Sequence, residues 1–199
     1  MNLPEAEAFI LNKLCTELSD TLYYHSPNHT LDVAEAAERI AEAEGITDEE
    51  TLSLLRTAAL FHDAGFLSAY QDHEAESSRL AQEHLPRFGY APRQIALICG
   101  MIAATKIPQS PKNKLEEILA DADLDYLGRP DYEPIAHLLY REMKALDLVP
   151  DEPTWNQIQI KFMEKHRYWT AYSETIRQPA KQAHLRRLKK GERDERRKG

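Results

Sequence analysis

The sequence predicts an all-α protein that folds as a single compact multi-helix domain. Three observations support this prediction: apolar residues recur at helical spacing in nearly every segment, the chain has only 7 glycines, and it contains no alternating strand pattern or hairpin turn. A chain of 199 residues with 42% hydrophobic residues is long enough to bury a core of its own.

Five helices are predicted in the first half of the chain. They cover about residues 5–19, 29–45, 47–65, 73–84 and 92–106. Gly45 and Gly65 end the second and third of them, and Pro86 and Pro108 follow the last two, as is typical where a helix ends. Pro27 breaks the loop after the first helix. The third helix has the clearest start signal, because Thr47 is a capping residue with Glu50 three positions later.

Four further helices are predicted in the second half, over about residues 115–128, 134–145, 153–176 and 179–190. A proline opens each of the last three, at the helix position where a missing N–H is tolerated best. No internal repeat, low-complexity tract or long linker divides the chain.

The charge of the chain is uneven. The formal net charge is −8, which argues against nucleic acid as a partner of the main body. From Lys181 onward the sequence is basic, so we divide the chain into a domain over residues 1–180 and a basic C-terminal helix or tail over residues 181–199. A solvated, frayed helix is the simpler interpretation of the tail, and a contact with nucleic acid or a membrane surface is the alternative.

The sequence gives no sign of a membrane segment. No apolar run approaches the roughly 18 residues that a membrane span needs. The N-terminus lacks the basic-then-apolar order of a signal peptide. The two cysteines, Cys15 and Cys99, are isolated within helical patterns. We therefore expect a cytoplasmic protein with two reduced thiols and no membrane partner.

The residues that could carry chemistry begin with the pair His62-Asp63. This pair closes the apolar stretch 52–61, where an unpaired carboxylate would be costly to bury. His29 lies 62 − 29 = 33 residues earlier, and a carboxylate cluster of Asp121, Asp123 and Asp125 follows about 60 residues later. Two imidazoles and two carboxylates from three helices would form a mixed nitrogen and oxygen site for a divalent metal.

Four ordered segments around these residues carry a resemblance to a known family. They are Tyr-His-Ser-Pro-Asn-His-Thr at 24–30, Ala-Ala-Leu-Phe-His-Asp at 58–63, His-Glu-Ala-Glu-Ser at 73–77, and Ala-Asp-Ala-Asp-Leu-Asp-Tyr-Leu-Gly at 120–128. Together they resemble the HD superfamily of metal-dependent phosphohydrolases, over about residues 20–130. The resemblance implies an all-α domain of HD type with a metal at its centre.

The resemblance also implies the metal ligands. His29, His62 and Asp63 match the ligand positions of the family, and one later aspartate would complete the set. We expect Asp123, because the last ligand of the family usually sits in an Ala-Asp-hydrophobic context; Asp121 is the competing candidate. The donor set suits Mn, Fe, Co, Ni, Zn or Mg. One ion per chain is expected. Dinuclear members use two more histidines in this interval, where the chain has only His73 and His84, and His84 falls deep in an amphipathic helix.

The implied activity is hydrolysis of a phosphate ester of a small molecule, a nucleotide in our expectation, by attack of metal-bound water. His73 would act as a general acid, although a second-metal ligand or a helix cap are alternatives. Glu74 would orient the water, and Lys106 would bind phosphate; ordinary interactions with helix dipoles are the alternatives for both. A Glu-Asp pair typical of the alarmone-hydrolase branch is missing after Asp63, which argues against that substrate.

Two other functions stay open at this point. One is a dinuclear HD-type enzyme, either a cyclic nucleotide phosphodiesterase or a di-iron oxygenase. The other is a non-catalytic HD module that binds a nucleotide. The intact ligand set argues against the second, because a degenerate member would be expected to lose a ligand.

Overall fold

The computed structural model of this chain is helical and describes residues 1–196, with side chains described for residues 1–192. These residues contain no β-strand, which confirms the all-α prediction. The elements follow in the order α1 (Leu3–Glu17), α2 (Pro27–Ala43), α3 (Glu49–Phe61), η1 (Ala64–Leu67), α4 (His73–His84), η2 (Leu85–Phe88), α5 (Pro92–Thr105), α6 (Lys114–Asp123), η3 (Asp125–Gly128), α7 (Tyr132–Ala145), α8 (Glu152–Lys165), α9 (Ala171–Ile176) and α10 (Gln178–Arg196).

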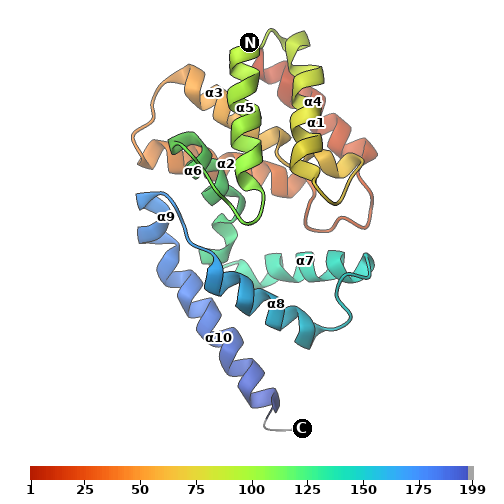
Figure 1. Ribbon diagram of the computed structural model, residues 1–199, viewed down its shortest axis with the longest axis vertical. Coiled ribbons are helices and arrows are strands. Elements are labelled where there is room, and N and C mark those ends of the chain that lie inside the picture. Colours follow the sequence, from red (N-terminus) through yellow and green to blue (C-terminus); the bar gives the residue numbers. More distant parts are fainter. Residues whose placement is uncertain (197–199) are drawn as a thin grey trace.

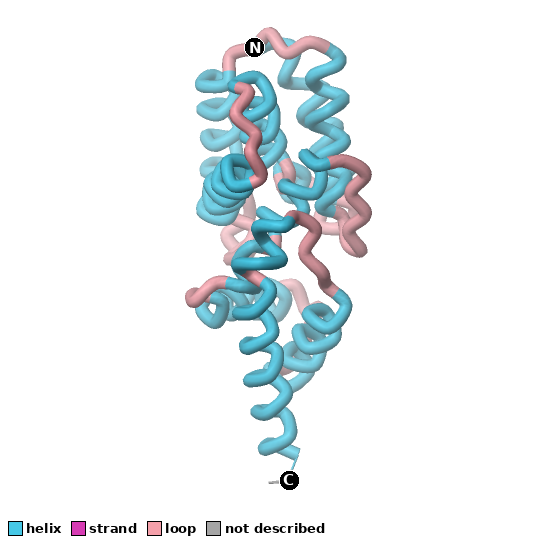
Figure 2. Tube along the Cα trace, turned by 90° about the vertical axis from the view of Figure 1, so that its left-hand side faces the viewer, coloured by secondary structure: helices cyan, strands magenta, loops and turns pink. Residues whose placement is uncertain are grey.

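The helices are arranged in two parts that share one interface. Helices α1 to α6 gather in the upper half of Figure 1, and α7, α8 and α10 lie below them (Figures 1 and 2). The larger core lies among α1 to α6 and contains fully buried side chains such as Ile10, Leu55 and Ile102. A second cluster, which includes Tyr126, Leu127, Met163 and Leu185, joins η3 to the lower helices. The two parts therefore meet around α6 and η3.

Several helices begin at a side chain that satisfies their first free N–H groups. Asp48 accepts from the backbone N of Thr51, and Asn113 accepts from the backbone N of Glu116. The prediction of Thr47 as the cap of α3 is thus wrong by one residue, because the carboxylate of Asp48 takes this role.

The predicted helix over residues 47–65 is shorter in the structure. The α-helix ends at Phe61, and residues 64–67 form the 3-10 turn η1. Gly65 is required in this turn: a Cβ atom there would lie 2.0 Å from the backbone oxygen of His73. The close approach of η1 to the start of α4 places residues 62–63 and 73–74 side by side.

The predicted single helix over residues 153–176 is wrong. The structure has α8 and α9, separated by an extended segment from His166 to Thr170. In this segment, hydrogen bonds to residues far away in the sequence replace the backbone hydrogen bonds of a helix. The backbone oxygen of His166 accepts from the Lys181 ammonium at 2.7 Å, and the backbone N–H groups of Trp169 and Thr170 donate to Asp121 at 2.9 Å.

The C-terminal helix α10 runs through the predicted boundary at residue 180. Its first half is not a solvated tail, because Lys181, His184 and Leu185 are buried where α10 contacts η3 and α8. Residues 197–199 of the predicted tail lie outside the described residues, as do the side chains of residues 193–196. Within the described part of the chain, no helix combines the length and apolar character of a membrane span.

Candidate metal centre

Four predicted site residues converge at the interface of α2, α3 and α6. His29 lies in the first turn of α2, His62 and Asp63 follow the last residue of α3, and Asp123 ends α6. Nε2 of His62 lies 3.1 Å from Oδ2 of Asp63 and 3.5 Å from Oδ1 of Asp123. Nε2 of His29 lies 3.4 Å and 3.3 Å from the same two oxygens. Two nitrogens and two oxygens from three helices thus face one point.

The donor atoms at this point lack other partners. Nε2 of His29, Nε2 of His62 and Oδ2 of Asp63 are buried and have no hydrogen-bond partner. Nδ1 of His62 donates to the backbone oxygen of Ala59 at 2.7 Å, which directs Nε2 toward the carboxylates. Buried polar atoms without hydrogen-bond partners are costly, and a divalent cation would satisfy all three of these atoms. The set fits such an ion without choosing among Mn, Fe, Co, Ni, Zn and Mg.

The charges of the four groups compensate one another. Burial by itself would lower the pKa of the two imidazoles, yet the neighbouring carboxylates raise the pKa of His29, and that of His62 well above its usual range. Burial opposes ionisation of the carboxylates as well, but the histidines lower the pKa of Asp123 to about 2 and hold the pKa of Asp63 well below its usual range. Ionised carboxylates in a buried cluster favour a cationic partner.

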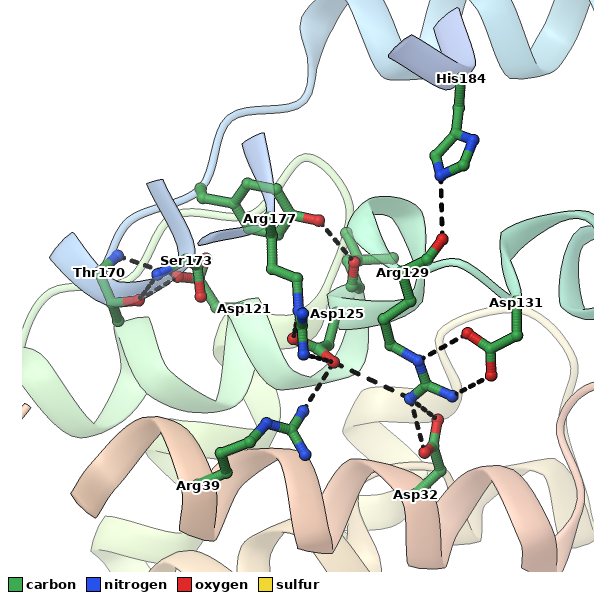
Figure 3. Close-up of polar contacts among 12 residues, drawn as sticks. Asp32, Arg39, Asp121, Asp125, Arg129, Asp131, Thr170, Ser173, Arg177 and His184 are labelled. Atoms are coloured by element: carbon green, nitrogen blue, oxygen red, sulfur yellow. Dashed lines mark hydrogen bonds and ion pairs between the residues drawn. The ribbon is translucent and has the colours of Figure 1, made fainter. Parts of the chain in front are cut away.

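The structure separates the two aspartates that competed for the last ligand position. Asp123 lies beside His29 and His62, whereas Asp121 accepts a hydrogen bond from the backbone N–H of Trp169. Asp121 also accepts from the N–H and hydroxyl groups of Thr170 (Figure 3). Asp121 therefore supports the N-terminal turn of α9. The geometry favours Asp123 as the ligand candidate.

Asp125 belongs to a separate ionic network that includes Arg39, Arg129 and Arg177 (Figure 3). Its carboxylate is 1% exposed and contacts Arg39 of α2 at 2.7 Å and Arg177, just before α10, at 2.7 Å. Arg129 lies 3.9 Å from it and pairs with Asp32 of α2 at 2.6 Å. In the structure these arginines connect the upper and lower helices.

His73 and Glu74 lie beside the cluster, at the start of α4. Nε2 of His73 is 3.4 Å from Oδ1 of Asp63 and 3.6 Å from Oε1 of Glu74. Its other ring nitrogen faces the backbone oxygen of Tyr70 at 3.3 Å. Asp63 therefore presents one oxygen to His29 and His62 and the other oxygen to His73.

Lys106 lies outside the cluster, at the surface of the protein. Its ammonium forms an ion pair with Asp72, and both side chains are exposed. Its neighbours Thr105 and Ile107 line the cavity described below, whereas Lys106 does not.

The structure links His25 to Glu142, a contact that no local sequence pattern indicates. Nδ1 of His25 donates to the carboxylate of Glu142, which is fully buried on α7 and also accepts the backbone N–H groups of Tyr24 and His25 at 2.9 and 3.0 Å. The His25 ring stacks on Phe66 with centroids 4.1 Å apart, and Phe66 stacks on His73 at 4.0 Å. His25 and Glu142 are 117 positions apart in the sequence, so no local sequence pattern connects them.

A cavity of about 240 Å³ opens over the cluster. Asp63, His73, Glu74 and Asp123 line one end of it, together with His25. The lower helices supply the remaining wall, which is mostly apolar. The site therefore has a polar end that could hold a metal and an apolar end that could hold an organic group.

Comparisons with known proteins agree with this geometry. The family model for the HD domain matches residues 28–125, a range that contains the whole cluster from His29 to Asp123. Among solved structures, the fold is similar to that of a predicted HD superfamily hydrolase from an uncultured Thermotogales bacterium. The TM-score is 0.60, and 24% of residues are identical over 100% of each chain. No curated protein sequence matches the chain.

Proposed function

Because residues 28–125 of this chain form an HD domain, and the chain thus belongs to the HD domain family, we propose that it is a metal-dependent phosphohydrolase. The proposed reaction is hydrolysis of a phosphate ester of a small molecule, of which a nucleotide is one example. One observation carries the proposal: three buried polar atoms, on His29, His62 and Asp63, have no hydrogen-bond partner, and Asp63 also lines the polar end of the cavity.

In this proposal His29, His62, Asp63 and Asp123 hold one divalent cation. When bound, such a cation supplies Lewis acidity, which favours ionisation of water and polarises a phosphoryl oxygen. The four side chains need little rearrangement to hold it, because each histidine Nε2 already lies 3.1–3.5 Å from an oxygen of both aspartates.

Proton transfer to the leaving oxygen is assigned to the imidazoles at the mouth of the cluster. His73 lies beside Asp63 and lines the cavity, as does His25. The buried carboxylate of Glu142 fixes the His25 ring through Nδ1, so that Nε2 is free to hold a proton on the cavity side. Glu142 is a positioning residue, because it contacts His25 and does not line the cavity. Glu74 is assigned the orientation of water.

A dinuclear enzyme is the second candidate function. It is favoured by one observation: the second oxygen of Asp63, Nε2 of His73 and Oε1 of Glu74 gather beside the first cluster, with His73 3.4 and 3.6 Å from the two carboxylates. Asp63 would bridge two ions in that case. Metal content per chain distinguishes one ion from two.

Release of phosphate from a panel of small phosphate esters tests the proposal. The purified chain is loaded separately with Mn²⁺, Co²⁺, Ni²⁺, Zn²⁺, Fe²⁺ or Mg²⁺. Turnover is expected with at least one ion, and the His62→Ala variant should lose it while keeping its far-UV circular dichroism. Full activity in His62→Ala would contradict the proposed site. Binding of an ester without turnover under any ion would favour a non-catalytic module.

A further inference from the structure

The wall of the cavity that faces away from the cluster is built from apolar side chains of three elements. Leu127 of η3, Leu139 and Met143 of α7, and Trp155, Ile158 and Phe162 of α8 all line it. The wall is continuous with the polar end, since one cavity includes both. An ester bound with its phosphorus at the cluster would therefore place its organic part against these side chains.

Charge limits the number of phosphate groups that the cavity can accept. Among its described lining residues there is no arginine or lysine, and its acidic side chains are Asp63, Glu74 and Asp123. Lys106, which lies next to the lining residues Thr105 and Ile107, pairs with Asp72 at the surface. A second or third phosphate group would meet no arginine or lysine of the described lining and would be repelled by the carboxylates. The cavity thus favours a single phosphate group.

The hydrogen-bonding groups at the apolar end already have partners. The hydroxyl of Tyr132 donates to Oε1 of Gln159 at 2.6 Å, and Nε2 of Gln159 donates to Asn156 at 3.2 Å. The hydroxyls of a sugar would lose water there and find few new partners. An apolar organic part has no such cost and gains from burial against the wall.

The size of the cavity sets the size of this organic part. A cavity of about 150 Å³ lined by apolar side chains accommodates benzene in another protein. The volume here is about 240 Å³, which leaves room for one to two rings in addition to the phosphate end. We propose, on the basis of the proposed function, that the substrate is a phosphate monoester of an apolar alcohol whose organic part is one or two rings in size.

Three esters of primary alcohols test this inference, because their leaving groups are chemically similar. They are 2-naphthylmethyl phosphate, ethyl phosphate and adenosine 5′-monophosphate, each measured with the chain loaded with its activating ion. The value of kcat/KM is expected to be at least about tenfold higher for 2-naphthylmethyl phosphate than for either of the others. An equal or higher value for adenosine 5′-monophosphate would overturn the inference and leave the proposed function standing.

A matched pair of variants locates the effect. Ile158 lines the cavity and is 38% exposed, so Ile158→Asn is expected to fold. It should lower kcat/KM for 2-naphthylmethyl phosphate by about tenfold and change that for ethyl phosphate less than twofold. The control is Ile176→Asn, at an exposed isoleucine outside the cavity lining, which should change neither value. Equal effects of Ile158→Asn on both esters would overturn the inference.

The experiments distinguish failure of the proposed function from failure of this inference. If no ester is hydrolysed with any ion, the proposed function fails, and the binding of 2-naphthylmethanol by calorimetry then tests the cavity alone. Binding that weakens about tenfold in Ile158→Asn and not in Ile176→Asn supports an apolar ligand in the cavity. No binding to the unmodified chain overturns the inference together with the function.

Discussion

The carboxylate of Glu142 on α7 is fully buried and holds the imidazole of His25 through Nδ1, across 117 positions of the chain. Burial opposes ionisation of Glu142, but the bonds from His25 and from the backbone of Tyr24 and His25 outweigh it and lower its pKa. A helix of the lower part thereby positions a ring that lies at the polar end of the cavity.

Glu142→Gln should lower kcat by about tenfold to a hundredfold and change KM little, because the amide holds the ring less firmly and misplacement of a proton donor slows the chemical step. Steady-state kinetics with the best ester measures both constants. Glu133→Gln, at an exposed position on the same helix, is the control and should leave both unchanged. A rise in KM alone would contradict the positioning role.

Metal content distinguishes the two aspartates of α6. The unmodified chain should bind about one equivalent of a divalent ion, Asp123→Ala should lose it, and Asp121→Ala should keep it while losing stability, because Asp121 supports α9. Elemental analysis after dialysis against the ion measures the content. Loss of metal in Asp121→Ala alone would contradict the proposed ligand set, and two equivalents would favour the dinuclear function.

Asp125 should be essential for stability. Asp125→Asn leaves the guanidinium groups of Arg39 and Arg177 facing a neutral amide at a position that is 1% exposed. Removal of one partner of a buried ionic network costs about 3–5 kcal/mol. Urea unfolding measures the free energy. Asp131→Asn, at the exposed edge of the same network, should cost less than about 1 kcal/mol, and equal losses in the two variants would contradict this assignment.

The candidate ligands that the structure brings together are those that local motifs indicate. His62 and Asp63 are adjacent, and the residues next to Asp123 favour it over Asp121; the structure brings all three together with His29. The helices that hold these residues are predicted from the spacing of apolar residues within each helix, which is also a local pattern.

The features that sequence patterns missed depend on long-range contacts. The break between α8 and α9 exists because Asp121 and Lys181 take the backbone groups that would otherwise continue the helix. The link between Glu142 and His25, and the apolar wall that α7 and α8 place over the cluster, likewise join residues far apart in the chain. Periodicity within one helix contains no information about these contacts.

Gly65→Ala should displace the start of α4. The added Cβ atom would meet the backbone oxygen of His73 at 2.0 Å, so the turn and the helix must separate. We expect a loss of stability of more than about 1 kcal/mol and a fall in kcat, because His73 and Glu74 move away from Asp63. Thermal unfolding and kinetics measure both. Gly191→Ala, where nothing lies within 4 Å, is the control and should be neutral or slightly stabilising.

Lys181 should make the stability of the chain depend on pH in the alkaline range. The Lys181 side chain is fully buried, and its ammonium donates hydrogen bonds to Nδ1 and to the backbone oxygen of His166. The ammonium also lies over the ring of Tyr168. Asp121 is the acidic group that raises the pKa of Lys181. Burial is the larger effect and lowers the pKa to about 8, from 10.5 in an exposed lysine.

Between these two pKa values the unfolded chain holds the Lys181 proton and the folded chain releases it, so the free energy of unfolding rises as the pH increases from 8 to 10.5. Below pH 8 both states are protonated and the burial of the charge destabilises the fold by a constant amount. Lys181→Met should remove a rise on the order of 2 kcal/mol, measured by urea unfolding at pH 7.5 and pH 10.5. The control is Lys190→Met, at an exposed lysine of the same helix, which should keep the rise of the unmodified chain. If Lys181→Met and Lys190→Met give the same pH dependence, then Lys181 is protonated in the folded state throughout this range, and its bonds to His166 outweigh its burial.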